Sequence, residues 1–151
     1  MMEGYGANGG WAEVWIALDP GISTGWALVA DDLKVLGHGV FTPDQVRDGV
    51  DRLVRGLHRN NYRVKVVVER LPKVSGVGNF TRELDEVVRT VYEVTVDTYD
   101  LDPRIIPPGE WKPSRAARVA KKWIKEGKEK MTQHEKDAIM MGVYAIIKER
   151  Q

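Results

Sequence analysis

The sequence predicts an α/β domain with a mixed five-stranded sheet, in which three antiparallel strands are followed by parallel strands and helices flank the sheet. Three apolar segments follow one another with short turns between them, as in an antiparallel meander. A β-branched segment at residues 63–70 comes after a helical pattern, so it has to cross back over that helix and lie parallel to the first strand. The length of 151 residues suits one domain with a full core.

The first strands and helix follow from the spacing of apolar residues. We expect strands at residues 13–18, 25–30 and 33–41, the first of them apolar on both faces and therefore central. A helix is expected from Thr42 or Pro43 to about residue 60, because its apolar residues recur at the helical period.

The second half of the chain adds one strand and three helical segments. Residues 71–79 form a loop, and an amphipathic segment follows at about residues 80–98. A short strand at 104–106 is stopped by two prolines, and helices are expected at 114–126 and 132–150. Residues 1–11 are expected to be a disordered tail, which leaves 12–151 as the domain. We expect Trp111 and Trp123 to be packing residues.

Charge is distributed unevenly along the chain. Residues 1–110 hold 12 basic and 17 acidic residues, whereas 111–151 hold 11 basic and 5 acidic ones. This asymmetry favours a basic surface that faces a polyanion. The absence of cysteine excludes disulfides and cysteine-based zinc sites. With no signal peptide and no apolar segment of membrane-spanning length, we expect a cytoplasmic protein, in the host cytoplasm if the source is a virus.

Two acidic residues stand where apolar strands end. Asp19 closes IALD before a proline-glycine turn, and Glu69 closes VVVE. Parallel neighbouring strands present their carboxyl ends at one edge of the sheet, so the two carboxylates should lie close together. Each acid also has a simpler explanation: Asp19 suits a turn cap, and Glu69 could pair with Arg70 or Lys65 or be solvated just past the strand.

The start of the last helix adds His134 and Asp137. They are three residues apart and share one helix face, which the apolar sequence after Asp137 turns toward the sheet. The simpler explanations are that the positive helix end stabilises the acid and that the histidine is merely solvated. Three carboxylates at one edge favour a hard divalent cation, and two such ions can activate water for phosphodiester hydrolysis. We therefore predict that Asp19, the acid at the end of the first strand, binds metal.

Three motifs in this order, DPGISTG at 19–25, VVVE at 66–69 and HEKDA at 134–138, resemble the RuvC-type Holliday junction resolvases of the RNase H-like superfamily. The resemblance extends over residues 13–150 and implies an RNase H-like fold. It implies a homodimeric endonuclease of DNA recombination and repair that cuts four-way junctions, with two Mg²⁺ per site and Mn²⁺ as a substitute. The implied metal ligands and catalytic residues are Asp19, Glu69 and Asp137, with His134 as a further ligand or as the group that handles a proton of the attacking water.

A basic segment precedes the last helix. Residues 112–130 contain eight basic and two acidic residues, several of them spaced three and four apart on one helix face. A solvated surface helix is the simpler explanation, but beside a nuclease site we expect phosphate contacts. The predicted DNA-binding residues are Lys73, Lys112, Arg115, Arg118, Lys121, Lys122 and Lys125.

Other functions remain open. A YqgF-like nuclease acting on RNA also begins with a strand that ends in aspartate. Sugar-kinase-like ATPases share the DxGxxxG opening but need two copies of the domain and a second phosphate loop. A catalytically silent nucleic-acid-binding scaffold would have no reason to keep all three acids. For the homodimer, we expect the exposed side of the helix at 80–98 to be the interface.

Overall fold

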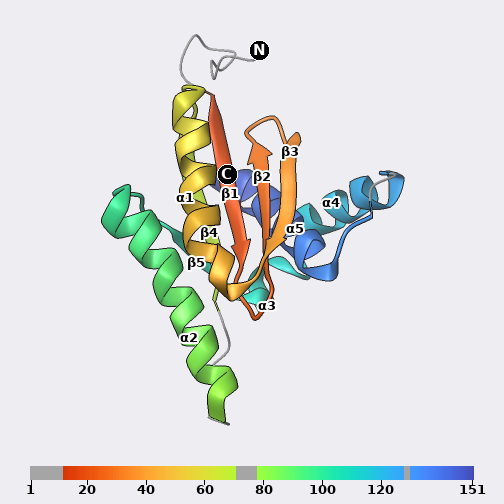
Figure 1. The fold of residues 1–151 in the computed structure, drawn as a ribbon. Helices are drawn as coiled ribbons and strands as arrows, with labels where there is room; N and C mark the ends of the chain where they lie inside the picture. Colours follow the sequence, from red (N-terminus) through yellow and green to blue (C-terminus); the bar gives the residue numbers. More distant parts are fainter. Residues whose placement is uncertain (1–11, 71–77, 128–129) are drawn as a thin grey trace.

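The computed structural model describes residues 12–70, 78–127 and 130–151, so the predicted N-terminal tail lies outside the described residues. A five-stranded sheet forms its centre, with the strand order β3-β2-β1-β4-β5 (Figure 1). The strands are β1 (Glu13–Asp19), β2 (Thr24–Ala30), β3 (Val35–Phe41), β4 (Arg63–Glu69) and β5 (Arg104–Ile106). The first three strands pair antiparallel with one another, while β4 is parallel to both β1 and β5. The predicted mixed sheet is confirmed.

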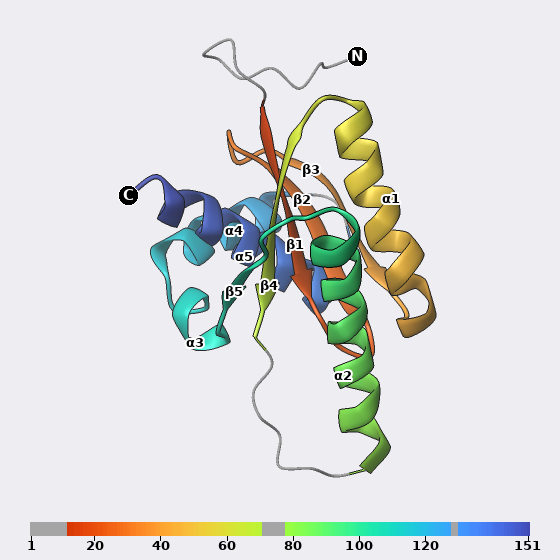
Figure 2. The same ribbon diagram turned by 90° about the vertical axis from the view of Figure 1, so that its left-hand side faces the viewer.

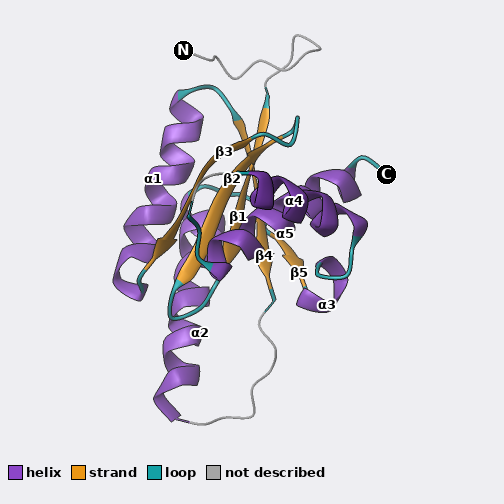
Figure 3. Cartoon of the chain, turned by 90° about the vertical axis from the view of Figure 1, so that its right-hand side faces the viewer, coloured by secondary structure: helices purple, strands orange, loops and turns teal. Residues whose placement is uncertain are grey.

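Helices cover both faces of this sheet. They are α1 (Val46–Arg59), α2 (Gly78–Tyr92), α3 (Pro108–Trp111), α4 (Arg115–Glu126) and α5 (Gln133–Glu149), with a 3-10 turn η1 (Pro43–Gln45) and a π-helical turn η2 (Glu93–Thr98). Figures 2 and 3 show the sheet from opposite sides, with α1 and α2 on one face and α3, α4 and α5 on the other. The result is a three-layer arrangement with one core on each side of the sheet.

Alternation along β1 assigns its side chains to the two cores. Val14, Ile16 and Leu18 are buried under α1 and α2, whereas Trp15 and Ala17 belong to the core under α5. Because side chains of a strand alternate between faces, the residue after Leu18 falls on the α5 face. This places the end of β1 toward the start of α5.

Two helical segments differ from the sequence prediction. The segment expected at 80–98 is α2 followed by the π-helical turn η2, in which the buried Thr95 hydroxyl donates to the Val91 carbonyl. The sequence does not predict the short helix α3, since the two prolines after β5 indicate only the end of the strand. Proline fits the first turn of a helix, where its missing N–H has no helical partner to lose, and Pro108 begins α3.

The two tryptophans near the C-terminus have different environments. Trp111 is fully buried, which confirms its predicted packing role, whereas Trp123 is 44% exposed. The prediction for Trp123 is wrong because the buried face of α4 consists of Ala116, Ala117, Ala120 and Ile124, and Trp123 is not part of it. The bulky Trp123 side chain is left at the flank of the helix. Within the described ranges, no helix has the length and apolar character needed to cross a membrane.

Candidate active site

Asp19 and Glu69 end neighbouring parallel strands at the same level. The last pair between β1 and β4 is Leu18 with Val68, so the two acids occupy the next position on each strand. In β4, as in β1, alternate residues face opposite cores: Val68 lies under α1 and α2, and Val67 lies under α5. Glu69 and Asp19 therefore both fall on the face that α5 covers.

The start of α5 lies directly on the sheet beside Asp19. Gly25 of β2 pairs with Asp19, and a Cβ atom on Gly25 would stand 2.2 Å from the carbonyl oxygen of His134. Only a residue without a side chain permits this approach, which explains the second glycine of DPGISTG. The approach brings His134 Nδ1 to 3.3 Å from Asp19 Oδ2, and the histidine side chain remains half exposed.

The acids at this edge influence one another electrostatically. Asp19 is only 7% exposed, and burial raises its pKa above the usual value, against the lowering effect of the His134 hydrogen bond. Burial, together with the negative charges of Asp19 and Asp137, raises the pKa of Glu69 to about 7. The positive charge of Lys112 lowers the pKa of both Asp19 and Glu69. The three predicted acids and Lys112 thus lie within electrostatic reach of one another, and His134 contacts Asp19.

Glu69 has a hydrogen-bond partner that the sequence did not indicate. The indole Nε1 of the buried Trp111 donates to Glu69 Oε2 at 2.8 Å. The suggested pairing of Glu69 with Lys65 is wrong, because Lys65 instead contacts Glu13 at 3.6 Å and also Glu149. One feature of the sequence could have indicated this contact: Trp111 follows β5 closely, and β5 pairs with β4 as far as Glu69.

A second unpredicted contact holds the first turn of α5. Glu135 accepts hydrogen bonds from the backbone N–H and hydroxyl of Thr132, both at 3.1 Å, in a capping box. Its other oxygen lies 2.5 Å from His38 Nδ1 on β3. Burial alone would raise the pKa of Glu135, but the contacts with His38 and Thr132 lower it below the usual value. Glu135 therefore ties the helix turn that carries His134 and Asp137 to the sheet.

The donor set suits a hard divalent cation, since it consists of carboxylate oxygens and one imidazole. A cation would also offset the repulsion between the carboxylates. Among the residues that the structure describes, however, no three His, Cys, Asp or Glu side chains stand close enough together to hold an ion. Asp137 instead accepts a hydrogen bond from Gln133 at 2.8 Å. The acids converge on one edge without forming a closed ligand set.

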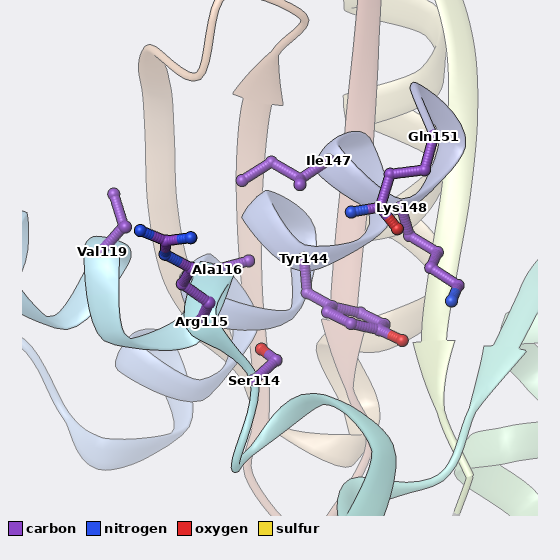
Figure 4. Close-up of a pocket in the computed structure, with 8 residues that line it drawn as sticks. All are labelled: Ser114, Arg115, Ala116, Val119, Tyr144, Ile147, Lys148 and Gln151. Carbon is purple, nitrogen blue, oxygen red and sulfur yellow. The ribbon is translucent and has the colours of Figure 1, made fainter.

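The predicted DNA-binding residues are exposed wherever the structure describes them. They lie in the segment after α3 and along α4, and they are Lys112, Arg115, Arg118, Lys121, Lys122 and Lys125. Arg115 also lines a cavity of about 220 Å³ between α4 and α5 (Figure 4). Lys73 lies outside the described residues.

Comparison with known proteins identifies the fold. No protein-family model and no curated protein sequence matches the chain. Among solved structures, T. thermophilus RuvC in complex with a Holliday junction substrate matches with a TM-score of 0.71 and 19% identity, over 91% of this chain and 96% of that one. Thermus thermophilus RuvC in another structure matches with a TM-score of 0.67 and 15% identity over the same shares of both chains. The chain therefore has the RNase H-like fold seen in RuvC.

Proposed function

We propose that this chain is a metal-dependent endonuclease that hydrolyses phosphodiester bonds in branched DNA, with four-way junctions resolved by paired nicks of a homodimer. The observation that carries the proposal is the convergence of Asp19 and Glu69 on one edge and one face of the sheet, directly beside the start of α5. The exposed cations of α4 and the fold shared with RuvC, which has been solved on a Holliday junction, support nucleic acid as the substrate.

In this proposal Asp19, Glu69 and Asp137 bind two Mg²⁺ ions, for which Mn²⁺ can substitute. Divalent ions between carboxylates activate a water molecule and stabilise the leaving oxygen of a phosphodiester. Because the acids are within electrostatic reach of one another but do not form a closed set, we expect the ions to draw the side chains together.

His134 and Lys112 have distinct roles in the proposal. The His134 ring is half exposed and is oriented by Asp19, so a neutral imidazole here can take a proton from the attacking water or serve as a further metal ligand. Lys112 is exposed and close enough to act on the charges of Asp19 and Glu69, which suits contact with the phosphate to be cut.

A substrate panel tests the proposal. The protein is incubated with Mg²⁺ and labelled four-way junction, linear duplex, flap and structured RNA, and junction cleavage by paired nicks is expected. Asp19→Asn should reduce cleavage by at least about 100-fold, because even outer residues of metal sites cost 10- to 100-fold when removed. Junction binding measured in EDTA should stay nearly unchanged, since it depends on phosphate contacts. Asp48→Asn, at an exposed position of α1, is the matched control and should cleave normally.

The outcomes also separate the alternatives. Cleavage of structured RNA alone would indicate an RNA-processing nuclease. Junction binding with no cleavage of any substrate, in Mg²⁺ or Mn²⁺, would indicate a silent scaffold. An Asp19→Asn protein that cuts at the wild-type rate would exclude Asp19 from the active site.

A further inference from the structure

We infer that Trp111 is the positioning residue of Glu69: its indole N–H holds one carboxylate oxygen, so that the other oxygen is presented to the metal. This inference rests on the proposed function of the acidic edge. It assigns to a buried tryptophan a role that packing alone does not require.

The hydrogen bond is well suited to fix the carboxylate. Trp111 Nε1 lies 2.8 Å from Glu69 Oε2, and the tryptophan is fully buried. A buried indole N–H needs an acceptor, and a bond to an ionised acceptor is among the stronger hydrogen bonds. In the part of the chain that the structure describes, Trp111 is the one hydrogen-bond donor to the Glu69 carboxylate. Rotation of that carboxylate is therefore limited by a group that cannot itself turn in the core.

The backbone around Trp111 is fixed from two sides. The Ser114 hydroxyl donates to the Trp111 carbonyl at 2.6 Å. The Ser114 hydroxyl oxygen also accepts a hydrogen bond from the Ala117 N–H, which caps α4. The Tyr144 hydroxyl of α5 donates to Glu110 Oε2 at 2.9 Å. Figure 4 shows Ser114 and Tyr144 on the wall of one cavity, which lies between the start of α4 and α5. The helix α3 is thus anchored to both neighbours and holds the indole in place.

The topology explains why α3 provides this group. β5 pairs with β4 as far as Ile106 opposite Glu69, and α3 begins two residues later. The chain therefore turns directly over the Glu69 end of the sheet. Lys112 directly follows Trp111 in the chain. Its ammonium group lies 5.6 Å from the Trp111 ring centroid, and its positive charge lowers the pKa of Glu69. One short segment thus supplies both a hydrogen bond and a positive charge to the same carboxylate.

A matched control exists in the same core. Trp15 of β1 is 3% exposed, belongs with Trp111 to the core under α5, and stands four residues before Asp19, away from the acidic edge. Trp→Phe at either position keeps most of the ring volume and removes the indole N–H. If Trp111 acts only by packing, the two substitutions should have similar effects on metal binding.

The test is Mn²⁺ binding by calorimetry without DNA, together with thermal melting. Trp111→Phe should weaken Mn²⁺ binding by about tenfold, as the loss of a residue that orients a ligand commonly does. Trp15→Phe should change binding by less than about twofold. In a Glu69→Gln background, Trp111→Phe should have no further effect, because the two changes act through one carboxylate.

Each outcome has a defined meaning. If wild-type protein binds no Mn²⁺, both the proposed metal site and the role of Trp111 are rejected. If the two phenylalanine variants bind Mn²⁺ equally well, only the role of Trp111 is rejected. If Trp111→Phe does not melt cooperatively, the inference is tested instead by NMR, on the indole N–H resonances of ¹⁵N-labelled wild-type protein. Among the five tryptophans, that of Trp111 should shift most when Mg²⁺ is added, and an unshifted Trp111 signal overturns the inference.

Discussion

The Glu69 carboxylate is buried at a cost that should be visible as a pH dependence of stability. Its pKa is about 7 in the folded protein and about 4.5 when unperturbed. Between these values the folded chain holds more protons than the unfolded one, so this group lowers the free energy of unfolding as pH rises from about 4.5 to about 7. Glu69→Gln should therefore be more stable than wild type at pH 8 and nearly equal at pH 4.5, in urea unfolding with EDTA. A constant difference across this range would contradict the raised pKa.

Gly25 tests the contact between the sheet and α5 at the level of one atom. Gly25→Ala places a Cβ 2.2 Å from the His134 carbonyl oxygen, and a helix backbone cannot move aside cheaply. We expect a loss of about 1–3 kcal/mol of stability and a loss of cleavage, because His134 and Asp137 are displaced together. Gly56→Ala is the control, since its Cβ would meet nothing within 4 Å. That change, within α1, should stabilise the protein by about 0.5–1 kcal/mol.

Among the elements, α4 has two faces with different chemistry. One face is buried and consists of three alanines and Ile124, while exposed cations cover the other. Replacing Arg118, Lys121, Lys122 and Lys125 by alanine should weaken junction binding and flatten its salt dependence, by about 0.9 in the log–log slope for each lost duplex phosphate contact. Thermal stability should hardly change, because alanine is the best helix former.

A second quadruple variant separates local contact from net charge. Alanine at four exposed arginines of α1, on the opposite face of the sheet, removes the same charge; they are Arg47, Arg52, Arg55 and Arg59. This variant should keep the wild-type slope. If the α4 variant keeps it as well, the helix is a solvated surface, and the DNA contacts have to be sought elsewhere.

The elements differ in how far the sequence predicts them. The strands are predictable because apolar alternation and short turns are local signals, and the acids at their ends follow from the parallel pairing of β1 with β4. The contact of Trp111 with Glu69 is not predictable in this way, since it depends on a short helix hidden behind two prolines. The pairing of His38 with Glu135 joins residues 97 positions apart, and no local pattern marks it.

At the scale of the whole molecule, the edge that carries Asp19 and Glu69 has its candidate site on one face of the sheet only. Both strand-end acids fall on the α5 face, so one chain presents one candidate site, whereas resolving a four-way junction requires two symmetric cuts. A two-fold dimer supplies two sites in matching geometry. All three ribbon views show α2 extending beyond the end of the sheet, on the face opposite to α5. We therefore expect a second copy to pack against α2.

The dimer prediction can be tested on α2 itself. Leu84 and Val88 are half-buried and one helical turn apart, next to the buried positions Val87 and Val91. Wild-type protein should sediment as a dimer at micromolar concentration, and Leu84→Glu should weaken that dimer by at least about tenfold, because a charge would be buried in an apolar contact. Val119→Glu, at a 54% exposed apolar position of α4, is the control and should remain dimeric. Dissociation by Val119→Glu alone would place the interface on α4, and a wild-type protein that stays monomeric with and without DNA would exclude the paired-nick mechanism.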